Sequence, residues 1–202
     1  MVKSLQLGYI CDTNIWVKVV LGNVRTSFFT TFKDISFADA VENEIIKWER
    51  NTDKYNKIAS NFVDSKNKSF EVIYLEDLDI ITQKAVKKQL KQFGFTNLDN
   101  SSATIKNLGE YLSVVYAYYL DIPFLQTEDI EFYEEIDLQS TFKGIEIVTW
   151  NEIAQKITKD DKERIRLNKI IESEQKIMSA RKKESDNLNA KLRAFQNKFN
   201  SR

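Results

Sequence analysis

Short apolar runs alternate with longer segments of helical periodicity along most of this chain. The apolar runs predict buried strands at residues 7–11, 35–38, 70–75, 123–127 and 145–150. Apolar residues at helical spacing between these runs predict helices over 13–21, 39–65, 78–93 and 109–120, with shorter helical segments at 28–33 and 130–136. Strands that alternate with helices in this way favour a mostly parallel sheet with helices on both faces.

Residues 151–202 carry a different pattern and contain neither glycine nor proline. Apolar side chains there fit an alternating spacing of three and four residues that Glu174, Arg181 and Ser185 interrupt: Leu167, Ile171, Met178, Leu188, Leu192, Phe195 and Phe199. This spacing predicts one long amphipathic helix, or two, with a weak coiled-coil signal. We therefore divide the chain into an α/β domain at 1–155 and a basic amphipathic helical extension at 156–202. The extension is expected to protrude and to form a homo-oligomer through its apolar stripe.

The formal net charge is zero, but the charges are unevenly distributed. Residues 159–202 hold 13 lysines and arginines against 7 acidic residues, whereas residues 1–158 hold 17 against 23. An acidic domain with a basic extension suits a metal-dependent enzyme that acts on a polyanion. An excess of lysine is also typical of an ordinary solvated helix, so charge alone leaves both interpretations open.

The composition excludes several classes of active site. The chain of 202 residues has no histidine and one cysteine, which rules out Ser-His-Asp triads, Cys-His pairs and ordinary zinc sites. The N-terminal apolar run is too short for a signal peptide, and no stretch reaches the roughly 18 apolar residues of a membrane span. We therefore expect a cytoplasmic protein without membrane association, whose chemistry rests on carboxylates, lysines, tyrosines or an oxygen-bound metal.

Four acidic residues stand where a predicted strand ends or near the start of a predicted helix: Asp12, Glu44, Glu110 and Asp129. Asp12 and Asp129 come just after the first and fourth strands, and sites in parallel sheets form beyond the carboxyl ends of the strands. Brought together, four carboxylates make an oxygen-only site suited to Mg²⁺ or Mn²⁺. Such a cation offsets their repulsion, lowers the pKa of a water and neutralises charge on a phosphoryl oxygen, which suits phosphodiester hydrolysis without histidine.

Two of these residues also have a purely structural interpretation, and a third has a neighbour that competes with it. Asp12 has the residue type and position of an ordinary helix N-cap. Glu110 could act only by favouring the N-terminus of its helix through the helix dipole. Glu128 stands beside Asp129, and the sequence does not decide which of the two carboxylates points inward.

The second acidic position is the least defined of the four. Glu44 lies within a predicted helix, where it could be a solvated surface residue. Asp39 and Glu42 compete with it as ligands. Asp39 followed three residues later by Glu42 also has the pattern of a capping box that opens the helix.

Taken in order, these motifs resemble those of the PIN-domain ribonucleases. The resemblance covers residues 7–150 and rests on an apolar strand followed by Asp12-Thr13-Asn14, on AVENEII around Glu44, on Leu108-Gly109-Glu110 before an apolar helix, and on LQTED with Thr127 and Asp129. It implies a three-layer α/β/α sandwich with strands in the order 3-2-1-4-5. It also implies metal-dependent RNA cleavage, often by the toxin of a toxin–antitoxin pair.

The favoured hypothesis is therefore a metal-dependent endoribonuclease in which the four carboxylates hold Mg²⁺ or Mn²⁺ and carry the catalysis. Thr13, Asn14 and Thr127 could orient carboxylates or bind phosphate, and could equally be helix caps. The RNA backbone would be held by the basic tail or by Lys87, Lys88 and Lys91. The alternative is a non-catalytic PIN-like module whose C-terminal helix binds a partner protein or a second copy. An inhibitor (antitoxin) protein is a further expected partner.

Overall fold

A computed structural model describes residues 7–50, 54–95, 107–135 and 138–200, with the side chains of the last helix described no further than residue 184. At its centre lies a parallel five-stranded sheet in the order β3-β2-β1-β4-β5. The strands are β1 Tyr9–Cys11, β2 Ile35–Ala38, β3 Glu71–Ile73, β4 Phe124–Gln126 and β5 Glu146–Val148. The predicted fold class, sheet order and C-terminal helix are confirmed.

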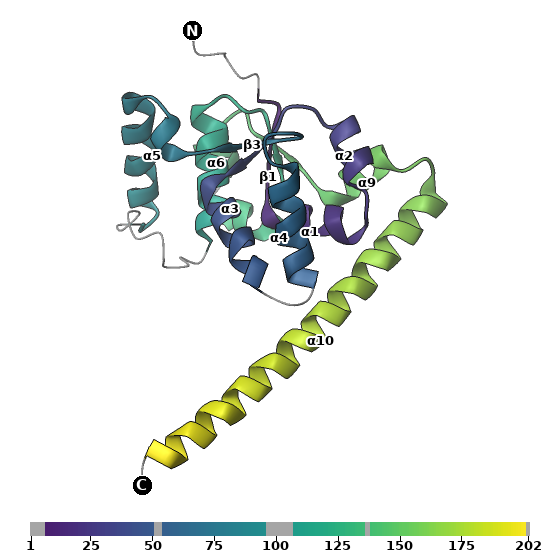
Figure 1. The fold of residues 1–202 in the computed structure, drawn as a ribbon. Helices are drawn as coiled ribbons and strands as arrows, with labels where there is room; N and C mark the ends of the chain where they lie inside the picture. Colours follow the sequence, from purple (N-terminus) through teal and green to yellow (C-terminus); the bar gives the residue numbers. More distant parts are fainter. Residues whose placement is uncertain (1–6, 51–53, 96–106, 136–137, 201–202) are drawn as a thin grey trace.

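Helices cover both faces of the sheet (Figure 1). On one face lie α1 (Thr13–Leu21), α2 (Arg25–Thr31) and α4 (Lys54–Ser65), and the other is covered by α6 (Leu108–Tyr119), which is flanked by α5 (Ile80–Gln92). The remaining helices of the domain are α3 (Asp39–Ile46), α7 (Ile130–Glu135), α8 (Leu138–Thr141) and α9 (Trp150–Ile157), with 3₁₀ turns η1 (Lys47–Arg50) and η2 (Leu75–Asp77). The result is the three-layer arrangement expected from the alternating pattern.

The register of the central strands places the candidate residues. β1 and β4 pair directly, with Cys11 opposite Gln126. The residues that follow, Asp12 and Thr127, therefore leave the sheet side by side at its carboxyl edge. The backbone N–H of Asp12 still donates to the carbonyl of Gln126 at 3.0 Å, which fixes this position.

A group of buried aromatic rings joins α1 and α4 to the sheet. Trp16 lies edge-on to Phe37, Phe62 and Phe70, with ring centroids 5.5 to 5.9 Å apart. Its indole N–H donates to the carbonyl of Ile58 at 3.2 Å, so the polar atom of this ring is satisfied within the core. Because Trp16 lies one turn after Asp12, this packing also fixes the start of α1.

One predicted helix is wrong. The pattern over 39–65 indicated a single helix, but α3 ends at Ile46, η1 follows, and α4 begins again at Lys54. The apolar residues counted as one stripe belong to α3, η1 and α4, and the ring of Trp48 in η1 lies edge to face with that of Tyr55 in α4, with centroids 5.2 Å apart. The predicted capping box is also absent, since Ala38 is the N-cap and Asp39 is already the first helical residue.

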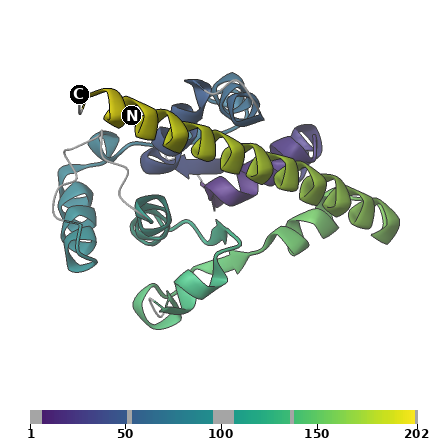
Figure 2. The same ribbon diagram turned by 90° about the horizontal axis from the view of Figure 1, so that it is seen from below.

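The last helix, α10 (Asp161–Asn200), crosses the carboxyl side of the sheet and then runs beyond the domain (Figures 1 and 2). Its first half buries Leu167, Ile171 and Met178 against the domain. Gly22 makes this approach possible, since a Cβ atom there would lie 2.6 Å from a methyl carbon of Leu167. The other stripe residues, Leu188, Leu192, Phe195 and Phe199, lie outside the described side chains. The division of the chain after residue 155 remains a prediction.

Two polar contacts add to this packing. The indole N–H of Trp150 donates to Asn168 at 2.9 Å, and Lys54 forms an ion pair with Glu174. Within the described residues, every helix is too short or too polar to span a bilayer.

Candidate functional site

Asp12 lies at the carboxyl end of β1 and is almost fully buried, with 3% of its surface exposed. It occupies the N-cap position of α1, where no side-chain bond of strict capping geometry forms, although the backbone N–H of Asn14 interacts with the carboxylate and acts to lower its pKa. Its Oδ2 atom instead accepts a hydrogen bond of 2.9 Å from the hydroxyl of Thr127, at the end of β4. The carboxylate is therefore held by the neighbouring strand in addition to the first turn of α1, and an ordinary N-cap does not require the strand contact.

Glu110 enters the site from the first turn of α6. The residue before it, Gly109, explains how this turn comes close, because a Cβ atom at Gly109 would lie 3.3 Å from a methyl carbon of Val41 on α3. A side chain at Gly109 would crowd Val41 on α3, the helix that carries Glu44. The Gly-Glu pair thus has a geometric reason that links two of the acidic positions.

Glu44 is the second acidic position that faces the site. Its Oε2 atom accepts a hydrogen bond of 2.9 Å from the hydroxyl of Thr13, the residue after Asp12. This contact joins α3 to the start of α1. Thr13 and Thr127 therefore each hold one carboxylate. Orienting carboxylates is one of the roles that the sequence allowed for these two residues.

The two competitors of Glu44 are engaged elsewhere. Glu42 is buried and accepts hydrogen bonds from Lys66 at 2.6 Å and from the hydroxyl of Tyr74 at 2.5 Å. Asp39 accepts from the backbone N–H of Ala40 and Leu75 and from the hydroxyl of Tyr116, at 2.8 to 3.2 Å. Both carboxylates tie secondary-structure elements together.

The neighbouring acids Glu128 and Asp129 have different surroundings. Glu128 is exposed and forms an ion pair with Lys18 of α1. The backbone N–H of Asp129 donates to the hydroxyl of Thr127 at 3.2 Å, and its carboxylate adds to the raised pKa of Glu110. Of these two acids, Asp129 is thus the one that lies close to Glu110.

The four carboxylates influence one another electrostatically. Burial raises the pKa of Asp12 to about 7, and the carboxylates of Glu110 and Glu44 add to the shift. Burial also raises the pKa of Glu110, with further contributions from Glu44 and Asp129. Asp12, Glu44, Glu110 and Asp129 therefore share one region, which we call the acidic cluster, and each proton taken up there relieves repulsion between like charges.

Sequence reasoning missed Tyr133, a residue of α7 that lies inside this region. Tyr133 is 1% exposed, and its hydroxyl donates to the backbone carbonyl of Glu110 at 3.5 Å and makes a hydrogen bond with the Thr127 side chain. Burial raises the pKa of this hydroxyl well above its usual range, with the charges of Asp12, Glu110 and Asp129 adding to the effect. The only signal in the sequence is an aromatic residue one helical turn after Asp129.

The chemistry of the acidic cluster fits a hard divalent cation, because its donors are carboxylate oxygens supported by hydroxyl groups. The carboxylates do not yet surround a common point. Among the residues that the structure describes, no three His, Cys, Asp or Glu side chains already form a ligand set for one ion. A cation bound there would offset the repulsion between these like-charged carboxylates.

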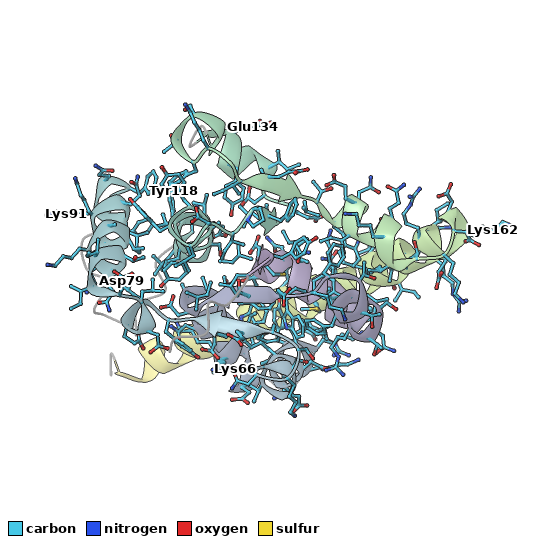
Figure 3. The ribbon with its side chains drawn as sticks, turned by 90° about the horizontal axis from the view of Figure 1, so that it is seen from above. Lys66, Asp79, Lys91, Tyr118, Glu134 and Lys162 are labelled. Atoms are coloured by element: carbon cyan, nitrogen blue, oxygen red, sulfur yellow. The ribbon has the colours of Figure 1, made fainter. Side chains whose placement is uncertain are left out.

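The remaining candidate residues lie farther out. Asn14 is exposed at the start of α1. Lys87, Lys88 and Lys91 are exposed on α5, at the outer edge of the molecule, and the side chain of Lys91 points away from it (Figure 3). Lys18 lies nearer to the carboxyl edge, where it pairs with Glu128 and approaches the ring of Trp150 at 5.8 Å from the centroid.

Comparisons with known proteins add little to this description. The sequence matches no model of a known protein family, and it matches no curated protein. Among solved structures, the chain is similar to the crystal structure of VapBC2 from Rickettsia felis bound to a DNA fragment from their promoter. The two share 14% sequence identity over 71% of this chain and 99% of that chain, with a TM-score of 0.42. A similarity at this identity and TM-score supports no functional argument, so the function of this chain has to be inferred from its own residues.

Proposed function

We propose that this chain is a metal-dependent endoribonuclease of the PIN-like kind, which hydrolyses RNA phosphodiester bonds at the acidic cluster. The observation that carries the proposal is the gathering of Asp12, Glu44 and Glu110 at the carboxyl edge of the sheet, where Thr127 and Thr13 hold the first two and the carboxylate of Glu44 adds to the raised pKa values of Asp12 and Glu110. Like charges gathered in a buried region are costly to a fold, and functional sites are where such arrangements concentrate. The order of the acidic motifs along the chain supports the same function.

Asp12, Glu44, Glu110 and Asp129 would hold one or more Mg²⁺ or Mn²⁺ ions, which supply Lewis acidity toward a phosphoryl oxygen and an attacking water. The chain's own hydroxyl groups prepare this site. Thr127 orients Asp12, and Thr13 orients Glu44. Fixing ligand rotamers in advance reduces the reorganisation needed when the cation and substrate arrive.

Tyr133 is a positioning residue in this proposal. Its hydroxyl contacts the end of β4 and the start of α6, the two segments from which Thr127, Asp129 and Glu110 extend. Because the hydroxyl remains neutral, it bonds to the backbone carbonyl of Glu110 and to the Thr127 side chain beside the carboxylates without adding negative charge. It sets the spacing between Glu110 and the β4 end and does not itself touch the reacting atoms.

RNA would reach the acidic cluster along the carboxyl side of the sheet, where α10 crosses the molecule (Figure 2). The basic residues of α10 would hold its backbone, and the lysines Lys87, Lys88 and Lys91 of α5 would serve only a long substrate, because they lie at the outer edge. Asn14 is exposed beside Asp12 and is available for a phosphate oxygen. We also propose that the chain acts as a toxin restrained by an inhibitor protein, a role supported only by the resemblance of its motifs.

A non-catalytic role is the second candidate. α10 runs beyond the domain and exposes Ile165, Ile170 and Ile177, which favours an interaction or oligomerisation element. The apolar side chains of α10 and the acidic cluster involve different residues, so substitutions can test each role by itself.

A cleavage assay separates the two candidates. The full chain should cut single-stranded RNA with Mn²⁺ or Mg²⁺ and lose this activity with a chelator, and Asp12→Asn and Glu110→Gln should each lower the rate at least about a hundredfold. Glu128→Gln is the matched control, because Glu128 neighbours Asp129 but pairs with Lys18, and it should keep the rate. Cleavage that survives both cluster substitutions, or no metal-dependent cleavage of RNA at all, would refute the nuclease proposal.

A further inference from the structure

A row of aromatic rings runs along the outer side of α6 and begins beside the acidic cluster. Its members, which we call the aromatic row, are Tyr111, Phe93, Phe142, Tyr118 and Tyr119, and the centroids of consecutive rings lie 4.6 to 6.0 Å apart. Tyr111 and Tyr118 stand two helical turns apart, so they share one side of α6. Because Tyr111 directly follows Glu110, one end of the row adjoins a carboxylate of the cluster.

Most of these rings are partly open to solvent. Phe142 is 1% exposed and belongs to the core, whereas Tyr118 is 41% exposed and the other three rings are half-buried against the core. Aliphatic side chains would complete a core at these positions equally well. A continuous line of partly open aromatic rings is unusual for a surface without a ligand, so it marks an interaction site.

The charged residues on the two sides of the aromatic row differ in sign. On one side lies α5, which ends at Phe93 and exposes three lysines: Lys87, Lys88 and Lys91. On the other side lies α7, where Glu134 is exposed. In Figure 3, Tyr118 lies between Lys91 and Glu134. A polyanion on the row is therefore favoured along α5 and repelled along α7, which places its charged backbone toward α5.

Aromatic rings beside lysines are suited to single-stranded nucleic acid. Unpaired bases stack on aromatic rings whatever their identity, while lysines hold the phosphates. A double helix keeps its bases stacked on one another and offers no base face to the row. An apolar protein segment would also cover the rings, but the row leads to the acidic cluster, where phosphodiester hydrolysis is proposed. A nucleic acid strand fits both the row and the cluster.

We propose that the aromatic row stacks the unpaired bases of an RNA strand on the side of the scissile bond away from α10, which restricts the substrate to single-stranded RNA. This inference rests on the proposed function for the role of the acidic cluster. Tyr118 lies about 10 Å beyond Tyr111 along α6. Bases beside the scissile bond therefore reach Tyr111 and Phe93, and only a longer strand reaches Tyr118.

Binding measured without cleavage tests the row by itself. The full chain with Asp12→Asn, in chelator, is titrated against a fluorescein-labelled uridine dodecamer and against a blunt RNA duplex of the same length, with fluorescence anisotropy as the readout. Adding Tyr118→Leu should weaken binding of the dodecamer at least about fivefold and leave duplex binding unchanged, because leucine remains apolar but cannot stack on a base. The salt dependence should stay the same, since the ring carries no charge. Tyr118→Phe should bind normally.

Phe29→Leu is the matched control, because Phe29 is a half-buried ring of α2, on the opposite face of the sheet, and its loss should not affect binding. An unchanged melting temperature shows that Tyr118→Leu is folded.

Cleavage separates this inference from the proposed function. With Mn²⁺ and Asp12 intact, Tyr118→Leu should raise KM for the dodecamer about fivefold with kcat unchanged, and should not affect cleavage of a dinucleotide, which is too short to reach the ring. If the chain binds the dodecamer through Tyr118 but cuts no RNA, the nuclease proposal fails and the row remains an RNA-binding surface. The inference is overturned if Tyr118→Leu binds the dodecamer as tightly as its parent, if dodecamer and duplex binding fall together, or if the chain binds neither.

Discussion

The hydroxyl of Thr127, just after β4, donates to the carboxylate of Asp12, just after the neighbouring parallel strand β1. The two residues are far apart in sequence, and the pairing of β1 with β4 makes them neighbours. The same hydroxyl accepts the backbone N–H of Asp129. One threonine thus connects the first and last residues of the acidic cluster, and several predictions about the cluster depend on this arrangement.

Asp12→Asn should stabilise the metal-free protein, and more strongly at pH 8 than at pH 5. The folded chain raises the pKa of Asp12 to about 7, whereas an unfolded aspartate titrates near about 4. Because the folded carboxyl holds its proton more tightly, its ionisation destabilises the fold progressively as pH rises between these two values. Asparagine carries no charge and can still accept from Thr127.

Melting temperatures of the two proteins, measured with chelator from pH 4 to pH 9, check this prediction. The difference should be near zero at pH 4 and reach a plateau above pH 7. A variant that is less stable than the natural chain at pH 8 would mean that Asp12 stabilises the fold as an ion and belongs to no repelling cluster.

Glu44→Gln and Glu42→Gln should have opposite consequences, although the residues share one helix. Glu44→Gln removes a carboxylate of the cluster and should lower Mn²⁺ affinity at least about tenfold with little change in stability. Glu42→Gln weakens the contacts with Lys66 and Tyr74 and should destabilise the fold by about 2 kcal/mol without affecting Mn²⁺ affinity. Urea unfolding and calorimetric Mn²⁺ titration measure the two effects. If Glu42→Gln lowers Mn²⁺ affinity and Glu44→Gln lowers stability instead, Glu42 is the ligand.

Tyr133→Phe should weaken Mn²⁺ binding about tenfold, because the hydroxyl that spaces Glu110 from the β4 end is lost. Tyr116→Phe is the matched control, since it removes a buried hydroxyl that donates to Asp39, away from the cluster. Each variant should lose about 1 kcal/mol of stability. Calorimetric titration with Mn²⁺ at pH 8 compares the affinities. Equal affinities in the two variants would reduce Tyr133 to a core residue.

Gly22→Ala should destabilise the chain by about 1–3 kcal/mol, because the added methyl group meets Leu167 and Ile171 and forces α10 outward. The same substitution should cost less in a Leu167→Ala background, where space exists for the methyl group. Urea unfolding of the four proteins gives the coupling. If the changes in unfolding free energy caused by Gly22→Ala and Leu167→Ala are simply additive, α10 does not pack on Gly22 in solution.

Much of the fold was predictable because its signals are local. The helix at 13–21 and the strand at 35–38 have the predicted bounds, since a turn or an acidic residue interrupts the apolar pattern at each end. The helix over 39–65 was wrong because periodicity does not distinguish one stripe from two helices in contact. In one continuous helix Trp48 and Tyr55 would lie about 10 Å apart along the axis, whereas in the structure their rings meet edge to face because they belong to η1 and α4.

The acidic cluster was predictable in part. Asp12 and Asp129 follow from the rule that strand ends meet at one edge of a parallel sheet. The choice of Glu44 over Glu42 did not follow, because it depends on Lys66 and Tyr74, which come from later elements and occupy Glu42. Tyr133 was not predictable at all, since its role depends on the direction of a short helix whose placement follows from tertiary packing.

The central claim is that the four carboxylates hold the catalytic cation, and anomalous diffraction from a crystal grown or soaked with MnCl₂ tests it most directly. The account predicts an anomalous peak between β1, β4 and the start of α6, with oxygen atoms of Asp12 and at least two of Glu44, Glu110 and Asp129 at about 2.2 Å. A peak only at other carboxylates, or carboxylates of the cluster that stay apart in saturating Mn²⁺, would contradict the account.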